Sequence, residues 1–323
     1  MSSSIRRCAI RFGWLGAILV GMGMDLRVSA SAEQGLKIPA PETRTLLTRD
    51  GLVLRCTFYP GGFVQKSAKE VIRVPGKQVV PVIMLHGWEG QRREFDSMAG
   101  VLQRMGFAVM LPDLRGHGES TKGVVARDRM RAADINAMAL DVEAARKFLL
   151  EKNNSGELNL SLLGVVGSGM GAIVAVNWAA LDWSRPQLPS YRPGCDVKAL
   201  VLLSPPQSVK GATLDKALQY PPVRGLSVMI VAGRGDRTAK SEATAIHKRL
   251  ERFHGAVQVK SEDKVASQTL WFLTPDTSLG GMELLKSKGL TVSQELVDFL
   301  RARLVRRAGD FPWSERTSPL SSK

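Results

Sequence analysis

Four apolar runs of strand length each end in a short motif whose residues can do acid–base or nucleophilic chemistry. In chain order the motifs are His86-Gly87-Trp88-Glu89-Gly90, Pro112-Asp113-Leu114-Arg115-Gly116-His117-Gly118-Glu119-Ser120, Gly167-Ser168-Gly169-Met170-Gly171-Ala172 and Ala232-Gly233-Arg234-Gly235-Asp236. Serine, histidine and aspartate together perform nucleophilic catalysis, in which the histidine takes the serine proton and the carboxylate orients the histidine. A serine without such a base stays a poor nucleophile, so this chemistry needs all three groups at one place.

The segments around these motifs predict an α/β fold with a doubly wound, mostly parallel sheet. From Val79 on, apolar β-branched runs alternate with amphipathic helical segments, which is typical of a parallel sheet covered on both faces. The expected strands are Val80–Leu85, Ala108–Leu111, Asn159–Val166, Ala199–Leu203, Leu226–Val231 and Thr269–Leu273. The expected helices are Glu94–Met105, Arg131–Glu151, Met170–Asp182, Ser241–His254 and Glu283–Leu304. Ligands bind such sheets at the carboxyl ends of the strands, so the four motifs should share one edge.

Two further features complete the predicted architecture. Thr43–Thr48 and Leu52–Phe58 predict an N-terminal hairpin around Asp50-Gly51. The connection between the fourth and fifth expected strands has room for a minimal lid with one short helix near Leu214–Leu218. We expect one domain over residues 40–307, followed by a flexible tail over residues 308–323 that is rich in Ser, Pro and charge.

The order and spacing of the four motifs resemble those of the α/β-hydrolase family, and the likeness covers nearly all of the chain after residue 32. In that family the third motif forms a sharp elbow that carries the nucleophile, with small residues two positions to either side. If the elbow centres on Gly169, the flanking residues are Gly167 and Gly171; if it centres on Ser168, they are bulkier. Glycine therefore occupies the nucleophile position. Ser168, one position earlier, should point elsewhere and is the less favoured nucleophile.

The resemblance also implies where the catalytic acid and base should stand. Asp236 occupies the acid position, although it can equally serve as the cap of the helix expected near Ser241. In similar family members a Thr-Ser-Leu-His-Gly loop precedes the last helix. Here that loop reads Thr277-Ser278-Leu279-Gly280-Gly281, so Gly280 stands in place of the histidine. Nucleophile and base are both missing, which predicts an inactive hydrolase relative.

None of the four histidines comes from the loop after the last strand. His86 and His117 lie in motifs where histidine is usually structural, His247 is expected to be exposed, and His254 ends a helix.

The oxyanion hole does not require the missing nucleophile and base, because it consists of backbone N–H groups. The resemblance assigns these donors to Trp88, which follows His86-Gly87, and to Met170, which follows the elbow. They predict a notch for a small carbonyl or anionic ligand.

The sequence of residues 1–32 predicts a signal peptide. Arg6 and Arg7 precede an apolar run of 13 residues, Phe12–Met24, and Ala30-Ser31-Ala32 supplies the small-x-small pattern of a cleavage site. The run is shorter than the ~20 residues of a spanning helix. Export to the periplasm or the medium is therefore favoured over an uncleaved membrane anchor.

The net charge of +15 falls to +12 without this leader, which holds four arginines and one aspartate. The basic residues are spread out, which favours an ordinary surface over attraction to an anionic envelope. The exception is a dense group at the end of the last expected helix: Arg301, Arg303, Arg306 and Arg307. No motif indicates nucleic acid, a metal site or a cofactor. The sequence leaves open whether Cys56 and Cys195 pair.

Three functions agree with these features. The favoured one is an exported, non-catalytic binding or scaffold protein. The first alternative is an active serine hydrolase of carboxylesterase or lipase type with an atypical active site. The second is a basic structural protein associated with the envelope. The residues at positions 169 and 280 separate the first two functions.

Overall fold

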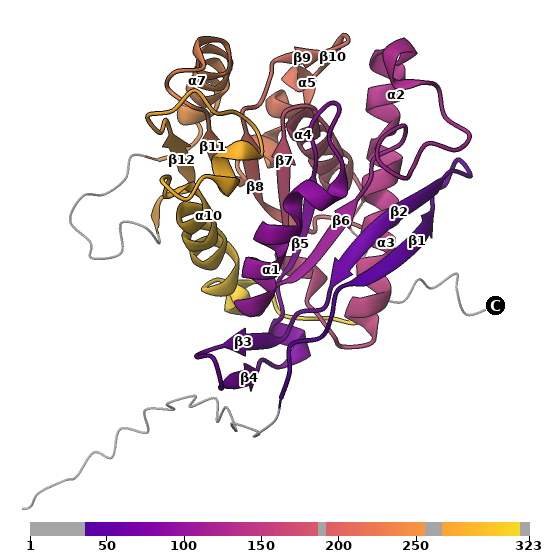
Figure 1. Ribbon diagram of the computed structural model, residues 1–323, viewed down its shortest axis with the longest axis vertical. Helices are drawn as coiled ribbons and strands as arrows, with labels where there is room; N and C mark the ends of the chain where they lie inside the picture. The colour runs from indigo at the N-terminus through magenta and orange to yellow at the C-terminus, as the bar shows by residue number, and fades with distance from the viewer. Residues whose placement is uncertain (1–35, 187–191, 256–266, 317–323) are drawn as a thin grey trace, which may run out of the picture. The chain divides into compact units, whose positions relative to one another are not determined.

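An eight-stranded sheet forms the centre of the computed structural model, which describes residues 36–186, 192–255 and 267–316 (Figure 1). Its order is β1 (Glu42–Leu47), β2 (Val53–Tyr59), β6 (Ala108–Pro112), β5 (Pro81–Leu85), β7 (Leu163–Ser168), β8 (Val197–Leu203), β11 (Ser227–Val231) and β12 (Leu270–Leu273). From β6 to β12 every neighbouring pair is parallel, and β2 runs antiparallel to both of its neighbours. The predicted doubly wound, mostly parallel sheet with an N-terminal hairpin is confirmed. The predicted signal peptide lies outside the described residues.

Helices cover both faces of the sheet (Figure 1). One hydrophobic core joins it to α2 (Ala132–Ala137), α3 (Ala139–Asn154), α4 (Met170–Trp183), α5 (Asp215–Gln219), α6 (Pro221–Arg224) and α7 (Arg237–Glu251). A second core, on the other face, holds α1 (Asp96–Arg104), α9 (Glu283–Lys286) and α10 (Val292–Leu300). No helix within the described ranges is long and apolar enough to cross a membrane.

The central strands are buried because both of their faces pack on helices. All residues of β5, β7 and β8 are buried, which explains their continuous apolar sequences. Helix α4 is apolar nearly all round and most of its residues are buried, Trp178 among them, as its sequence predicts. These elements hold the strand ends and the start of α4 in fixed positions.

The segment between β8 and β11 is compact. It contains the short pair β9 (Ser208–Val209) and β10 (Ala212–Thr213) and then α5 and α6, where we expected one helix. A second small sheet, β3 (Phe63–Gln65) with β4 (Val71–Arg73), also escaped the sequence analysis, because strands of two or three residues give no clear pattern. Neither cysteine is paired: Cys56 and Cys195 are both free and buried.

Two expected helices are interrupted. The segment expected as Arg131–Glu151 divides at Met138 into α2 and α3. The segment expected as Glu283–Leu304 begins as α9, breaks around Gly289 and resumes as α10, which continues into a π-helical turn, Arg301–Val305. Strand β7 begins later than expected because the Asn159 side chain accepts from the Ser161 N–H and caps a short 3₁₀ turn.

The predicted flexible tail is wrong for its described part, residues 308–316, which pack on the domain. The Trp313 indole donates to the Asn153 carbonyl at 3.1 Å. The Arg316 guanidinium is 2% exposed and forms an ion pair with the buried carboxylate of Asp196. The tail's polar composition hid these contacts, because their partners lie more than a hundred residues earlier in the chain.

Candidate functional site

The turn between β7 and α4 has the geometry of an elbow centred on Gly169. This residue has φ +51° and ψ −118°, in a region that favours glycine. A Cβ at Gly167 would lie 2.4 Å from the Gly171 carbonyl oxygen, and one at Gly171 would lie 2.3 Å from the Leu85 carbonyl oxygen. Only glycine fits at these two flanking positions. At Gly169 itself the nearest atom to a Cβ would be the Gly87 Cα, at 3.7 Å, so that position has room for a side chain but carries none.

The second empty position is Gly280, in the loop after β12. A Cβ there would lie 3.5 Å from Asp236 Oδ2 and 3.4 Å from Ser204 Oγ, which are ordinary contacts. Asp236 comes directly before α7 and caps it, because its Oδ1 accepts from the Ala239 N–H at 3.0 Å. The same carboxylate therefore caps the helix and points its other oxygen toward Gly280.

Ser204 is a site residue that the sequence analysis missed. It follows β8, has φ +45°, and its Oγ accepts from the Gly281 N–H at 2.9 Å. This contact ties the loop after β12 to the end of β8. The only sequence signal was the position of Ser204 at the carboxyl end of a buried strand.

The sequence predicts that Ser168 points away from the site, but the structure places it in the site. It is 4% exposed and lines the same cavity as Gly169, Asp236 and Gly280. Its Oγ would lie 2.9 Å from a Cβ at Gly281, so the missing side chain there leaves the hydroxyl open to the cavity. In the described part of the chain we find no hydrogen bond to this Oγ.

Among the described residues that line this cavity there is no histidine. His86 is fully buried; its Nδ1 lies 2.8 Å from the Gly87 carbonyl oxygen, and its Nε2 accepts from the Leu114 N–H at 3.0 Å. Burial lowers its pKa to about 4, so the ring is neutral at pH 7 and fixes the turn before Trp88. His117 packs between His86 and Trp88, with ring centroids 5.1 Å and 5.5 Å away. Both histidines are structural.

The other two histidines lie near β12. His247 is half-buried and stacks on Phe272, with ring centroids 4.6 Å apart, where we had expected it to be exposed. His254 Nδ1 lies 2.8 Å from Thr269 Oγ1. Neither ring is among the described residues that line the cavity with Ser168.

The two backbone donors assigned by resemblance come from different elements of the site. Trp88 lines the cavity, and Met170 is the first residue of α4. For the part of the chain that the structure describes, neither N–H has an acceptor. Both groups therefore remain available to an acceptor on a ligand.

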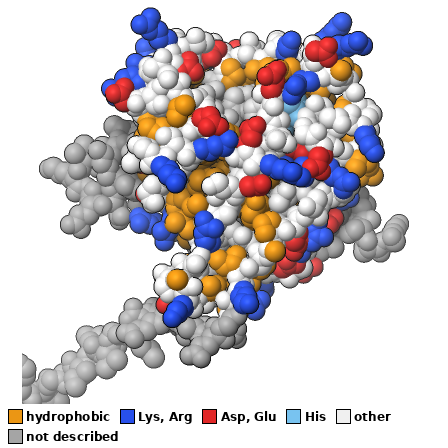
Figure 2. Space-filling model, in the orientation of Figure 1, with side chains coloured by type: hydrophobic (Ala, Val, Ile, Leu, Met, Phe, Trp, Pro, Cys, Tyr) orange, Lys and Arg blue, Asp and Glu red, His pale blue; other side chains and the backbone are white. Residues whose placement is uncertain are grey.

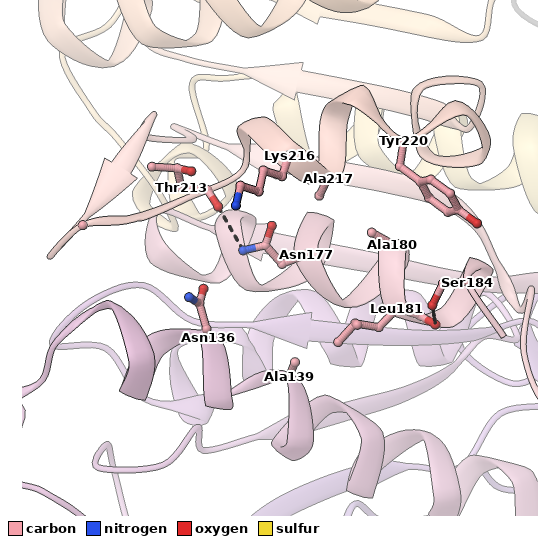
Figure 3. Close-up of a pocket in the computed structure, with 11 residues that line it drawn as sticks. Asn136, Ala139, Asn177, Ala180, Leu181, Ser184, Thr213, Lys216, Ala217 and Tyr220 are labelled. Atoms are coloured by element: carbon pink, nitrogen blue, oxygen red, sulfur yellow. Dashed lines mark hydrogen bonds between the residues drawn. The ribbon is translucent and has the colours of Figure 1, made fainter.

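The cavity has a volume of about 590 Å³ and lies at the carboxyl ends of the parallel strands. A larger hollow of about 680 Å³ lies elsewhere, between α3, α4 and α5 (Figure 3). There the Asn177 side chain donates to the Thr213 carbonyl at 3.0 Å, and Lys216 extends toward it. Of the described residues that line this hollow, none is a histidine, a cysteine or a carboxylate. The strand-end cavity is therefore the candidate site.

Basic residues are dispersed over the face of the described chain that Figure 2 shows. Figure 2 shows lysine and arginine side chains interspersed with acidic ones on the visible face. The arginine group at the end of the last helix is not one patch, because Arg303 is 4% exposed and donates to Ser227 Oγ, and Arg307 pairs with Asp310.

The known sequences that resemble this chain include hydrolases. A family model described as "Serine aminopeptidase, S33" matches residues 77–224, which include the elbow but end before Asp236. The AB hydrolase superfamily protein YisY of Bacillus subtilis is 30% identical over 124 residues. That match covers 38% of this chain and 37% of the length of the relative.

Solved structures of similar fold include esterases. A dienelactone hydrolase from Anabaena variabilis has a TM-score of 0.56 at 17% identity, covering 83% of this chain and 100% of its own. The Pyrococcus furiosus esterase has a TM-score of 0.51 at 16% identity, covering 82% and 93%. A carboxyl esterase from Bacillus coagulans has a TM-score of 0.52 at 12% identity, covering 82% and 99%. At these identities the likeness establishes the fold.

Proposed function

Because this chain has the α/β-hydrolase fold, we propose that it is an exported binding protein that has lost serine-hydrolase catalysis. The observation that carries the proposal is the pair of vacant positions at Gly169 and Gly280. Each has room for a side chain, and the second lies beside the carboxylate of Asp236. The scaffold of a catalytic triad is thus present without its nucleophile or its base.

The binding role rests on groups that do not depend on those side chains. The Trp88 and Met170 N–H groups have no acceptor within the described residues. Backbone donors at this end of the sheet suit a carbonyl oxygen of a small ligand. The cavity of about 590 Å³ beside them has the size of a small-molecule site.

A competing function is serine hydrolysis through Ser168, which the position of its Oγ in the cavity favours. This hydroxyl would need a base within hydrogen-bond reach. His86 cannot act as that base, because both of its ring nitrogens are engaged by backbone groups. We therefore prefer the binding role.

Labelling with a fluorophosphonate probe, together with hydrolysis of p-nitrophenyl acetate, tests the proposal. The purified protein should show neither, and the Ser168→Ala variant should behave the same. Robust labelling that disappears in Ser168→Ala would overturn the non-catalytic proposal and establish Ser168 as the nucleophile.

A further inference from the structure

We propose that the strand-end cavity binds a small organic cation, an ammonium or guanidinium group that pairs with the carboxylates of its lining. This inference rests on the proposed binding role and names the ligand class. Five carboxylate residues and one lysine line the cavity: Glu89, Glu94, Asp236, Glu242, Glu283 and Lys286. The cavity wall is thus acidic in a chain whose net charge is +15.

The lysine neutralises only one of these acids. Lys286 Nζ lies 2.8 Å from Glu283 Oε1, and both side chains are exposed. The other four form no ion pair with any described residue. Three of them, Glu94, Asp236 and Glu242, are half-buried, where solvent screens their charges less than at an open surface.

Backbone donors hold these three carboxylates in place and leave one oxygen of each without a donor. Glu94 Oε1 accepts from the Gln91 N–H, and Glu242 Oε1 accepts from the Gln207 N–H, both at 3.3 Å. Asp236 is held in the same way by α7. Among the described residues the second oxygen of each carboxylate has no hydrogen-bond donor. Fixed acceptors of this kind lose little freedom when a cation binds.

The second, independent observation is Ser168. Its side chain is more than nine-tenths buried, lines the cavity and has no hydrogen-bond partner in the described ranges. Because Gly281 has no Cβ, no side chain of that residue covers the hydroxyl. A hydroxyl lone pair accepts from an N–H donor, so Ser168 adds a neutral acceptor for the same cation.

These charges change the ligand that the sequence alone indicated. The notch at Trp88 and Met170 suits a carbonyl or an anion, but the carboxylates of the cavity repel an anion. The combination fits a ligand whose carbonyl oxygen meets the backbone donors and whose cationic group meets the carboxylates.

Three probes of the same chain length separate charge from shape: 1,4-diaminobutane, 1,4-butanediol and succinate. We expect calorimetric titration of the purified protein to detect binding of 1,4-diaminobutane and neither of the others, weakening as salt is added. Glu242→Gln should weaken this binding about twofold to fivefold, the effect of removing one partly exposed ion pair. Glu151→Gln, at an exposed position of α3 outside the cavity, should leave it unchanged.

Blocking the cavity gives a second test. Gly280→Phe should abolish the binding of 1,4-diaminobutane, because this position lines the cavity and its backbone does not require glycine. Equal binding of the diamine and the diol, or equal weakening by Glu151→Gln and Glu242→Gln, would overturn the inference. If the protein also stays inert to fluorophosphonate, the proposed binding role survives that result. Labelling by the fluorophosphonate would instead overturn the non-catalytic role. The titrations with 1,4-diaminobutane would then be interpreted separately from it.

Discussion

Asp236 Oδ2 lies 3.5 Å from the point where a Cβ of Gly280 would be. A side chain at this position would begin in contact with the carboxylate and would meet no backbone atom at short range. The other vacant position, Gly169, is equally open but has φ +51°. The two positions thus differ in backbone strain, although both have space.

The first prediction is that Gly169→Ser combined with Gly280→His produces weak esterase activity, while neither change alone does. Nucleophile and base act as a unit, so a single replacement gives little. Initial rates on p-nitrophenyl acetate and labelling by a fluorophosphonate probe provide the measurement. A correctly folded double variant that stays inert would show that the strand-end cavity no longer has the geometry of its hydrolase relatives.

The same two variants should differ in stability. Gly169→Ser places a Cβ in a left-handed backbone conformation and should lower the free energy of unfolding by ~1–3 kcal/mol. Gly280→His carries no such backbone penalty and should change it by less. Urea denaturation of both variants checks this, and equal losses would contradict the assignment of strain to the elbow.

The pH dependence of stability should contain a contribution from His86. Burial lowers its pKa from 6.5 to about 4. In the unfolded chain His86 is protonated below pH 6.5, whereas in the folded chain it is protonated only below about pH 4. The contribution of the neutral His86 ring to the free energy of unfolding is at its full value above pH 6.5. It decreases by about 3 kcal/mol as the pH falls from 6.5 to 4.

Comparison with His86→Asn isolates this contribution. The variant should be less stable at pH 7 by about 1–3 kcal/mol, because the Leu114 N–H loses its acceptor. Between pH 6.5 and 4 it should lose less stability than the natural protein. Parallel curves for the two proteins over this range would show that the buried ring does not resist protonation.

The last described residue should stabilise the whole domain. Arg316 pairs with buried Asp196, which also binds Arg146 at 2.7 Å. Arg316→Ala should therefore lower the free energy of unfolding by about 2–4 kcal/mol, because the buried Asp196 carboxylate then keeps, of the described residues, only Arg146 as an ion-pair partner. The matched control is Arg307→Ala, whose exposed pair with Asp310 is worth about 0–1 kcal/mol. Similar losses in both variants would contradict a structural role for the end of the chain.

Export is tested by sequencing the N-terminus of the protein from its native host. Ala30-Ser31-Ala32 predicts a mature chain that starts at or close to Glu33. An intact Met1 would contradict cleavage and favour the membrane anchor.

The sheet could be predicted from the sequence because its parallel strands are buried on both faces. Such strands are short apolar β-branched runs, and each ends where glycine and charge begin. The division at Met138 was not predictable, since the residues around it favour helix on both sides. The packing of Trp313 and Arg316 was hidden for another reason: it depends on partners far away in sequence, which local composition does not report.

The elbow was predictable because its requirement is steric and local. Crowding at Gly167 and Gly171 selects small residues there, and the register of these two glycines can be read directly from the sequence. The orientation of Ser168 was not predictable, because it depends on the missing Cβ of Gly281 in a distant loop. The acidic cavity wall also brings together residues from separate loops and helices, which no single motif reveals.

The glycines of the elbow and of the loop after β12 differ in whether they can accept a side chain. Gly167 and Gly171 cannot gain a side chain without moving backbone, so the architecture of the turn is closed to gradual change. Gly169 and Gly280 have room for a Cβ, with backbone strain at Gly169 alone, so a side chain can be added at either site without moving neighbouring backbone. The two catalytic side chains are therefore separable from the architecture of the turn, and the backbone donors and carboxylates around them do not depend on either one.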